Sequence, residues 1–254
     1  MLKNTQEINF RNYNNLDTTC QKIDQPDGLK IELMEHQKTA VKGMLSLEKD
    51  GYLYISNLIY FTSQPQDFKV ETTVGILGDK VGSGKSLMII TLILLSKSPI
   101  KRDIFYESSK FINVKSLHTN EKCLDCNMLI VPQKIFNQWV SFFDLAPKLK
   151  LYQCKDDESI KNLSVDDVPN YDVVLVPCSK SDIINEKFGP YRWNRIFIDE
   201  ADSIKLSKNI TLNASFVWLI TGTPSGILYA NKPYLTNIFQ KNKTWITDYI
   251  TVKN

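Results

Sequence analysis

The stretch Gly78-Asp-Lys-Val-Gly-Ser-Gly-Lys-Ser86 decides the fold, because a glycine-rich turn of this composition is suited to holding phosphate groups. Its inner glycines, Gly82 and Gly84, permit positive φ angles and a close approach of the backbone to an anion. Successive N–H groups and the amino end of a following helix then face the phosphates. We expect Lys85 to bridge the β- and γ-phosphates of ATP, and the Ser86 hydroxyl to coordinate Mg²⁺.

The residues on either side of this loop support that interpretation. The apolar run Val74–Leu77 precedes the loop and is typical of a strand, whereas the apolar run Leu87–Leu95 follows it and indicates a buried helix. The strict pattern has glycine where Asp79 stands, so the match is to a variant. The alternative is a glycine-rich turn that happens to precede Lys-Ser. The phosphate-loop interpretation predicts that nucleotide is bound by Asp79, Lys80, Val81, Gly82, Ser83, Gly84, Lys85 and Ser86.

A cluster of carboxylates ends another apolar strand, in Arg195-Ile-Phe-Ile-Asp-Glu-Ala-Asp202. Ligands of parallel sheets gather at the carboxyl ends of the strands, so we expect Asp199 beside the phosphate loop, holding Mg²⁺ through water. Glu200 is placed to act as general base on the attacking water. Asp202 is placed to pair with a neighbouring polar group. The alternative is an acidic helix start, because Asp and Glu are favoured at that position.

Two hydroxyl side chains follow the apolar strand Val217–Ile220. Thr221 and Thr223, in the sequence Thr-Gly-Thr-Pro, are placed to hydrogen-bond the Asp202 carboxylate and to couple hydrolysis to movement of a second lobe. A plain strand-ending turn is the alternative. Trp218, inside the strand, is expected in the core rather than against a ligand.

The rest of the chain alternates between strands and helical stretches. A helical period runs from Ile31 to Leu47, and residues 51–70 indicate a strand hairpin. Further strands are expected at Met128–Val131, Leu149–Tyr152, Val173–Val176 and Ile196–Ile198, with a helix at Ile135–Phe143. This alternation predicts an α/β fold, a parallel sheet with helices on both faces. We divide the chain into a polar leader (1–28) and one domain (29–250), within which 97–126 form a surface insertion.

Composition agrees with one ordinary globular domain. The chain has 254 residues, of which 43% are hydrophobic, enough for one sizeable core. The apolar runs are too short for a membrane span of roughly 20 residues, and the amino end lacks a secretory signal, so we expect an intracellular protein without a membrane partner. A net charge of +3 permits a polyanionic partner without requiring one.

The five cysteines are expected to be reduced thiols. Cys123 and Cys126 have the spacing of metal ligands, but one such pair is only half a zinc site. Two plain thiols are therefore favoured over zinc.

In their order along the chain, these motifs resemble those of superfamily-two helicases, and most closely the Snf-type branch of double-strand DNA translocases. The stretch Asp79–Ser86 is similar to that branch's Asp-Glu-x-Gly-x-Gly-Lys-Thr motif, so Asp79 is a feature of the branch. Trp193 with Ile196–Asp202, and then Leu219–Pro224, resemble two further motifs of the family. The resemblance spans residues 30–226. It implies a RecA-like ATP-binding lobe, an ATP hydrolase of the helicase or translocase type, and ATP with Mg²⁺ as cofactors.

The resemblance also implies contacts outside the phosphate loop. Leu33-Met-Glu-His-Gln37 looks like the upstream glutamine element, in which Gln37 would read the adenine edge. Leu129–Pro132, with Trp139 after it, and Tyr171–Val176 with the turn that follows resemble two motifs that contact a nucleic-acid backbone. A nucleic-acid partner is implied, with DNA favoured over RNA. The implied contact residues are Pro132, Gln133, Lys134, Ser179 and Lys180, for which solvated loop residues are the alternative.

The sequence departs from the family pattern in the later motifs. Ser225-Gly226 stands where the branch usually has Leu-Gln, and Asp202 where it commonly has His. No second RecA-like lobe with arginine fingers is expected within this sequence, so such a lobe is implied as a partner, in cis or in trans. The alternative is a truncated or split module that binds nucleotide or a partner without efficient turnover. The Lys- and Asn-rich chain also looks like helicases of large cytoplasmic DNA viruses. Its expected place is therefore the cytoplasm or nucleus, or a viral factory or virion.

Overall fold

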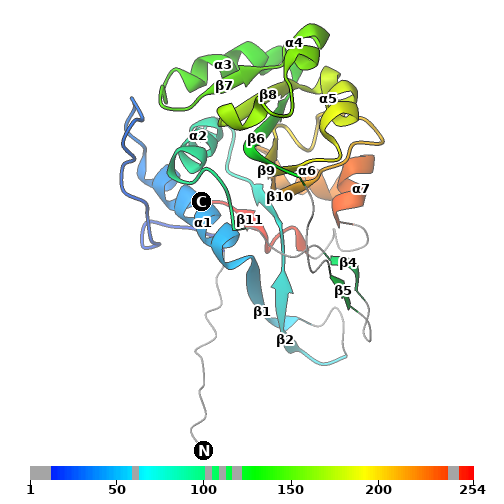
Figure 1. The fold of residues 1–254 in the computed structure, drawn as a ribbon. Coiled ribbons are helices and arrows are strands. Elements are labelled where there is room, and N and C mark those ends of the chain that lie inside the picture. The colour runs from blue at the N-terminus through cyan, green and yellow to red at the C-terminus, as the bar shows by residue number, and fades with distance from the viewer. Residues whose placement is uncertain (1–12, 59–62, 101–104, 109–112, 116–121, 240–245) are drawn as a thin grey trace, which may run out of the picture.

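A parallel sheet forms the centre of the molecule (Figure 1). The computed structural model describes residues 13–58, 63–100, 105–108, 113–115, 122–239 and 246–254. Within them, seven strands pair in parallel in the order β11-β3-β10-β9-β6-β8-β7. Their bounds are β3 Val74–Leu77, β6 Cys123–Val131, β7 Leu151–Gln153, β8 Val173–Pro177, β9 Arg192–Ile198, β10 Ala214–Ile220 and β11 Thr251–Val252. The predicted α/β fold is confirmed.

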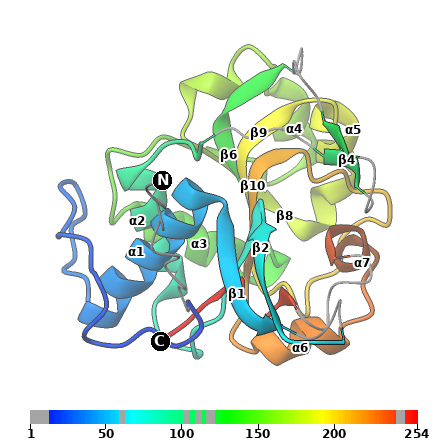
Figure 2. The same ribbon diagram turned by 90° about the horizontal axis from the view of Figure 1, so that it is seen from below.

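Helices cover both faces of this sheet, as Figure 2 shows. One face carries α1 (Glu35–Asp50), α2 (Lys85–Leu95) and α3 (Phe136–Phe143); the other carries α4 (Asp157–Asn162), α5 (Ser181–Phe188) and α7 (Pro233–Phe239). The short helices are η1 (Gln133–Ile135), η2 (Val168–Asn170), η3 (Cys178–Lys180) and α6 (Pro224–Tyr229). Because both faces are covered, β8 and β9 are buried along their whole length. β8 is a continuous apolar run, whereas β9 becomes continuously apolar only at Ile196–Ile198, after the buried Arg192, Asn194 and Arg195.

The remaining strands form two small antiparallel pairs. β1 (Tyr52–Leu58) pairs with β2 (Gln66–Glu71), which confirms the predicted hairpin, and β4 (Phe105–Ser108) pairs with β5 (Asn113–Lys115). The second pair belongs to the predicted insertion 97–126. Among the described helices, none combines the length and the apolar character that a membrane crossing requires.

The structure moves several predicted boundaries. The helix expected from Ile31 begins at Glu35, after the extended Met34. The strand expected from Met128 begins at Cys123, so the last residues of the expected insertion belong to the sheet. The start of this strand is not evident from the sequence, because the polar Asp125 and Asn127 interrupt the apolar run of β6.

Residues beyond both predicted limits of the domain also contact the sheet or the segment that follows its last strand. β11 pairs with β3 beyond the predicted limit at 250. The described part of the polar leader contacts the segment after β11, because Leu16 N–H donates to the Lys253 carbonyl and Lys253 N–H to the Tyr13 carbonyl, each at 2.9 Å. Residues 1–12 of the leader lie outside the described residues, and the domain limits stay predictions.

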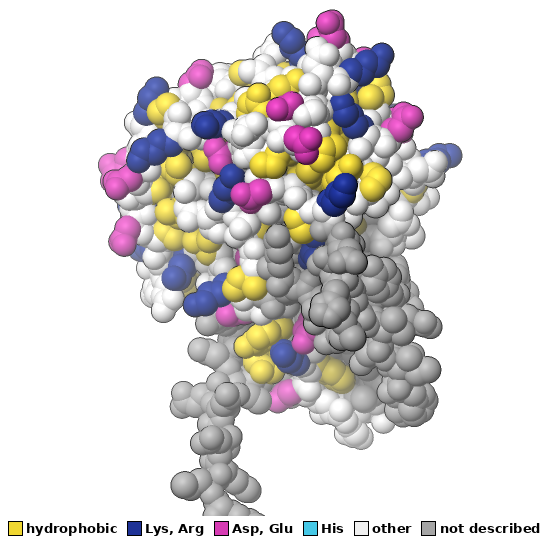
Figure 3. All heavy atoms as spheres, in the orientation of Figure 1, with side chains coloured by type: hydrophobic (Ala, Val, Ile, Leu, Met, Phe, Trp, Pro, Cys, Tyr) yellow, Lys and Arg dark blue, Asp and Glu magenta, His cyan; other side chains and the backbone are white. Residues whose placement is uncertain are grey.

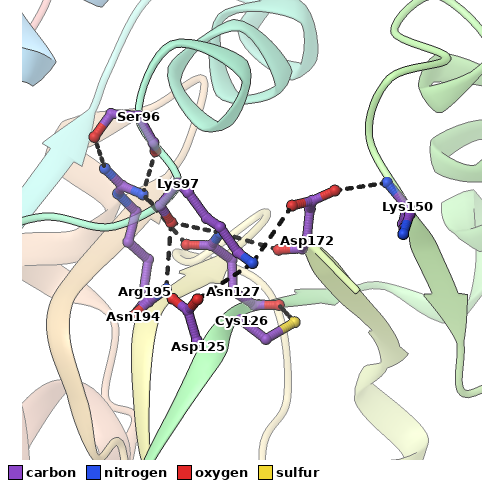
Figure 4. A network of polar contacts seen from close by, with 9 residues as sticks. All are labelled: Ser96, Lys97, Asp125, Cys126, Asn127, Lys150, Asp172, Asn194 and Arg195. Atoms are coloured by element: carbon purple, nitrogen blue, oxygen red, sulfur yellow. Dashed lines mark hydrogen bonds and ion pairs between the residues drawn. The ribbon is translucent and has the colours of Figure 1, made fainter. Parts of the chain in front are cut away.

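A polar network joins the strands at the amino edge of the sheet (Figure 4). The Asn127 Nδ2 donates to the carbonyls of Lys97 and Asp172 at 3.1 and 3.0 Å. The Asn194 Nδ2 donates to Asp125 Oδ1 at 2.9 Å. These bonds satisfy polar groups that would otherwise be left unpaired where β6, β8 and β9 begin.

A buried ion pair ties α1 to the same edge. Arg195 is fully buried, and its Nε and Nη2 donate to the two carboxylate oxygens of Glu48 at 2.7 and 2.6 Å. The Trp218 Nε1 donates to Glu48 Oε1 at 2.7 Å, which confirms Trp218 as a core residue. The Arg195 guanidinium is therefore committed at the amino half of β9, away from the carboxyl edge.

Candidate functional site

The phosphate loop lies where β3 ends and α2 begins. Gly82 and Gly84 both have a φ of +83°, the positive values that the sequence predicts. A Cβ atom at Gly84 would displace the end of the Gln37 side chain, whereas one at Gly82 would meet nothing within 4 Å. The positive φ is therefore the main reason for glycine at both positions.

The first turn of α1 holds the middle of this loop. The Gln37 Nε2 donates to the Ser83 carbonyl at 3.0 Å, and the His36 Nε2 lies 3.0 Å from the same oxygen. The Gln37 Oε1 accepts from the Met34 N–H at 2.9 Å. Both ends of the Gln37 amide therefore bind within the chain, and its reading of adenine stays a prediction.

Asp79 anchors the beginning of the loop. Its side chain is buried, and its carboxylate oxygens accept from the Asn254 backbone N–H at 2.7 Å and from the Asn254 Nδ2 at 3.0 Å. The carboxylate therefore faces the segment after β11. Lys80 and Val81, which complete this part of the loop, are exposed.

The invariant cation of a phosphate loop is Lys85, whose Nζ donates to the carbonyls of Asp79 and Lys80 at 2.9 and 3.0 Å. Burial lowers the pKa of Lys85, and the negative charges of Asp199, Glu200 and Asp79 act in the opposite direction. The structure therefore places the two sequence motifs within one electrostatic site, although they are more than a hundred residues apart.

Asp199 directly follows β9 and is buried at this site. Its Oδ2 accepts from the Trp139 Nε1 at 2.7 Å, and its Oδ1 accepts from the Glu200 N–H at 3.0 Å. Desolvation raises the pKa of Asp199 to about 6, although these two hydrogen bonds act to lower it. A cation bound beside Asp199 would remove this penalty by favouring the charged carboxylate.

Glu200 follows with an exposed side chain and a φ of +51°. Among the described residues it is the one non-glycine with positive φ. Such a backbone is strained for a residue with a Cβ, and strain of this kind concentrates at functional sites. The bend lies directly after the strand and leaves the Glu200 side chain exposed, while its role as general base stays a prediction.

The predicted contact between Asp202 and the two threonines is confirmed. Thr221 Oγ1 donates to Asp202 Oδ1 at 2.7 Å, and Thr223 Oγ1 donates to Asp202 Oδ2 at 2.8 Å. The intervening Gly222 lies against the phosphate loop, since a Cβ there would be 2.6 Å from Val81 Cγ2 and 3.8 Å from Lys85 Nζ. The acidic cluster, the threonine turn and the phosphate loop are therefore in mutual contact, while the coupling role stays a prediction.

The predicted nucleic-acid residues meet at the same carboxyl edge of the sheet. Pro132 follows β6, and the Gln133 Oε1 accepts from Ser179 Oγ, which follows β8, at 2.6 Å. Lys180 pairs with Asp157 at 2.6 Å, so its charge is partly neutralised within the chain. Lys134 is exposed. Two motifs expected to contact one backbone thus lie side by side.

The residues present suit a magnesium nucleotide. The buried Asp199 carboxylate and the Ser86 hydroxyl are oxygen ligands of the kind Mg²⁺ prefers. The Ser83 Oγ is buried in the loop without a hydrogen-bond partner among the described residues, as expected where a ligand completes the bonding.

The cysteine pair has a different character. Cys126 is buried in β6, its thiol donates to the Asn127 carbonyl at 3.5 Å, and burial raises its pKa. In the described part of the chain, no group of three or more His, Cys, Asp or Glu side chains is arranged to hold a metal ion.

The sequence interpretation missed the contact of Trp139 with Asp199. Trp139 entered that interpretation only as a member of a motif near nucleic acid. The signal that could have found it is chemical, because a buried indole N–H usually needs an acceptor. The helix α3 places that N–H against the carboxyl end of β9.

Comparison with known proteins identifies the family. Residues 36–227 match the SNF2-related domain. A protein of Acanthamoeba polyphaga mimivirus named "Putative helicase R592" is 25% identical over 94% of this chain and 38% of its own length. The DNA repair protein RAD5B of Arabidopsis thaliana is 30% identical over 59% of this chain and 13% of its own length. The chain thus spans well under half the length of these relatives.

A solved structure shares the fold. The SWI2/SNF2 ATPase core of Sulfolobus solfataricus, solved in complex with dsDNA, is similar with a TM-score of 0.57 and 17% identity, over 92% of this chain and 46% of that one. The tetrapeptide Asp199–Asp202 does not place the chain in the DEAD-box branch, because the matching family is the SNF2-related one. The phosphate loop, the acidic strand end and the threonine turn are thus parts of one inherited arrangement, and this chain belongs to the family of SNF2-related domains.

Proposed function

We propose that this chain is the first, ATP-binding lobe of an ATP-dependent DNA helicase or double-strand DNA translocase, which couples ATP hydrolysis to movement on DNA. The observation that carries the proposal is the convergence of Lys85, Asp199 and Glu200 in one electrostatic site, with the Asp202–threonine contact beside it. A binding site for phosphate alone would need the loop, but not the aligned carboxylates.

Each residue has a role that its position supports. Lys85 Nζ would leave the loop carbonyls to bind the β- and γ-phosphates, and Ser86 with Asp199 would hold Mg²⁺, which neutralises developing phosphate charge when bound. The exposed Glu200 would accept a proton from the attacking water. Asp202 would report the state of the nucleotide through Thr221 and Thr223 to a second lobe.

A second RecA-like lobe, in cis or in trans, belongs to the proposal. Phosphoryl transfer of this kind uses a guanidinium on the γ-phosphate. In the described part of the chain both arginines, Arg192 and Arg195, are buried in β9, and Arg195 is paired with Glu48. A cationic group from another lobe would complete the site.

DNA is favoured as the track for two reasons. The Sulfolobus structure is of a complex with dsDNA, and the Arabidopsis relative is named for DNA repair. On the face in Figure 3, basic and acidic side chains are interspersed, so that face presents no broad basic patch. The contacts proposed to phosphate are therefore those of Gln133, Lys134, Ser179 and Lys180, and contacts of this kind carry no sequence information. An intracellular setting, in the cytoplasm, nucleus or a viral factory, is part of the same proposal.

The test of nucleotide binding is a thermal melt with and without Mg²⁺–ATP. A ligand that binds the folded state raises the melting temperature, and we expect Lys85→Ala to abolish that rise. Lys187→Ala is the matched control, because Lys187 Nζ also donates to two carbonyls, those of Ile160 and Lys161, far along the chain from the loop. Equal nucleotide-induced shifts in Lys85→Ala and the parent would contradict the assignment.

A further inference from the structure

Trp139 makes a buried polar contact with the carboxylate of the acidic strand. Its side chain is 1% exposed, and its Nε1–H donates to Asp199 Oδ2 at 2.7 Å. The second oxygen of that carboxylate accepts from the Glu200 backbone N–H. The orientation of Asp199 is therefore held from two directions, by its own strand end and by a helix that lies 60 residues earlier.

The indole itself has little freedom. Phe142, one turn further along α3, packs edge-on against it, with ring centroids 5.9 Å apart and an interplanar angle of 84°. A tryptophan fixed by packing presents its N–H in one direction. The hydrogen bond therefore transmits the position of α3 to the Asp199 carboxylate.

We propose that Trp139 is a positioning residue, whose indole N–H fixes the Asp199 carboxylate in the orientation that holds Mg²⁺. The inference rests on the proposed function, because it concerns the metal of that nucleotide site. A carboxylate has about four lone-pair positions, so the two hydrogen bonds that Asp199 accepts leave positions with which it could hold a metal-bound water. Partners that orient a metal ligand in this way typically change metal affinity by about 10- to 100-fold when they are removed.

The location of Trp139 gives this contact a further consequence. α3 follows directly on η1, which contains Gln133 and Lys134, two of the predicted nucleic-acid contacts. A DNA backbone held at η1 would thus lie one short helix away from the group that orients the metal ligand.

The experiment separates metal from nucleotide. A non-hydrolysable ATP analogue is titrated calorimetrically into the parent and into Trp139→Phe, once with Mg²⁺ and once with EDTA. We expect Trp139→Phe to lose about 10- to 100-fold in affinity with Mg²⁺ and less than twofold with EDTA. Trp218→Phe is the matched control, because that indole also donates to a buried carboxylate, that of Glu48, at 2.7 Å. It should change neither affinity.

Three results would overturn the inference. One is an unchanged Mg²⁺-dependent affinity in Trp139→Phe, and another is an equal loss with and without Mg²⁺, which would make Trp139 a structural core residue. The third is absence of nucleotide binding by the parent, which would overturn the proposed function first.

A spectroscopic measurement on the unsubstituted chain covers a variant that fails to fold. The chain has four tryptophans, so its indole N–H signals are few in a ¹⁵N-correlated spectrum. The Trp139 signal should shift when Mg²⁺ is added to the analogue-bound chain, while the Trp218 signal stays in place. A Trp139 signal that ignores Mg²⁺ would overturn the inference.

Discussion

Individual residues at this site are held in states that the rest of the fold enforces. Asp199 is buried with a raised pKa, Glu200 has a strained backbone, and the Lys85 Nζ binds carbonyls of its own loop. The buried charge of Asp199 and the positive φ of Glu200 each have a cost in the ligand-free protein, and a bound cation would relieve the first of them. The buried charge of Asp199 and the strained backbone of Glu200 can therefore be tested by measuring the free energy of unfolding, without an assay of activity.

The buried charge of Asp199 should destabilise the ligand-free protein at neutral pH. Its pKa is raised to about 6 in the folded state from 3.8, so its contribution to stability is full below pH 4 and is lost as the pH rises through 6. Asp199→Asn avoids that loss. We expect this variant to be more stable than the parent at pH 7.5, by about 3 kcal/mol.

The check is urea denaturation without Mg²⁺ at several pH values, with Glu200→Gln as control for the exposed neighbouring carboxylate. The advantage of Asp199→Asn should shrink as the pH falls and disappear near pH 4. A difference that does not vary with pH would contradict the assignment of the buried charge.

The backbone of Glu200 makes a separate prediction. A residue with a Cβ is strained at a φ of +51°, whereas glycine is not. Glu200→Gly should therefore be more stable than Glu200→Ala by about 1 kcal/mol, the reverse of the order in a helix. Denaturant titration of the two variants measures this, and an alanine variant of equal or higher stability would argue against the strain.

At the scale of elements, two opposite edges of the sheet have separate tasks. The carboxyl edge carries the candidate nucleotide site. The amino edge carries the polar network (Figure 4) and the Glu48–Arg195 pair. The strands β9 and β10 run between these edges and place Asp199 and Thr221 at the carboxyl edge, beside the phosphate loop.

Loss of one partner from the buried pair should therefore affect stability alone. Glu48→Gln leaves the Arg195 charge buried without its counter-ion, and we expect a loss of about 3–5 kcal/mol in unfolding free energy. Nucleotide affinity of the folded fraction should not change, because the pair lies at the far edge. In a double-mutant cycle, Glu48→Leu with Arg195→Met should lose less stability than Glu48→Leu and Arg195→Met added together, and strict additivity would mean that the pair is not coupled.

The elements differ in how far the sequence predicts them. Val74–Leu77 and Val217–Ile220 are continuous apolar runs beside recognisable motifs, so their strands and the site residues at their ends could be predicted. β11 has only two residues, Thr251 and Val252, and a strand this short has no periodicity of its own. Its hydrogen bonds to β3 define it as a strand.

Contacts between distant segments were equally hidden. The bonds from Asn254 to Asp79 and from Trp139 to Asp199 join residues far apart in the chain, and neither has a local pattern. The contact of Asp202 with Thr221 and Thr223 could be predicted, because both motifs end adjacent strands of a parallel sheet.

At the scale of the whole molecule, the proposed function assigns to this chain one half of an active site for phosphoryl transfer. We expect residues 1–254 to hydrolyse ATP very slowly even with duplex DNA, because a missing arginine finger removes about 10³–10⁵ in rate. A steady-state ATPase assay measures this, with Glu200→Gln as the blank and addition of a second lobe as the rescue.

The translocase and the split binding module predict different results when a second lobe is added. DNA-stimulated turnover after a second lobe is supplied would support the translocase, whereas nucleotide binding without turnover under the same conditions would favour the split binding module. Robust turnover by the verified monomer would show that the chain has its own cationic group at the γ-phosphate.

The hydrogen bonds between Asp79 and Asn254 can form only after Asn254 has been synthesised. The two residues are 175 positions apart, yet the second fixes the first turn of the phosphate loop. Translation proceeds at about 5–20 residues per second, so a nascent chain carries its complete Gly78–Ser86 sequence for many seconds before Asn254 emerges. Through that interval Asp79 has no such partner, and the loop acquires its anchor only after all seven described strands of the parallel sheet have been synthesised.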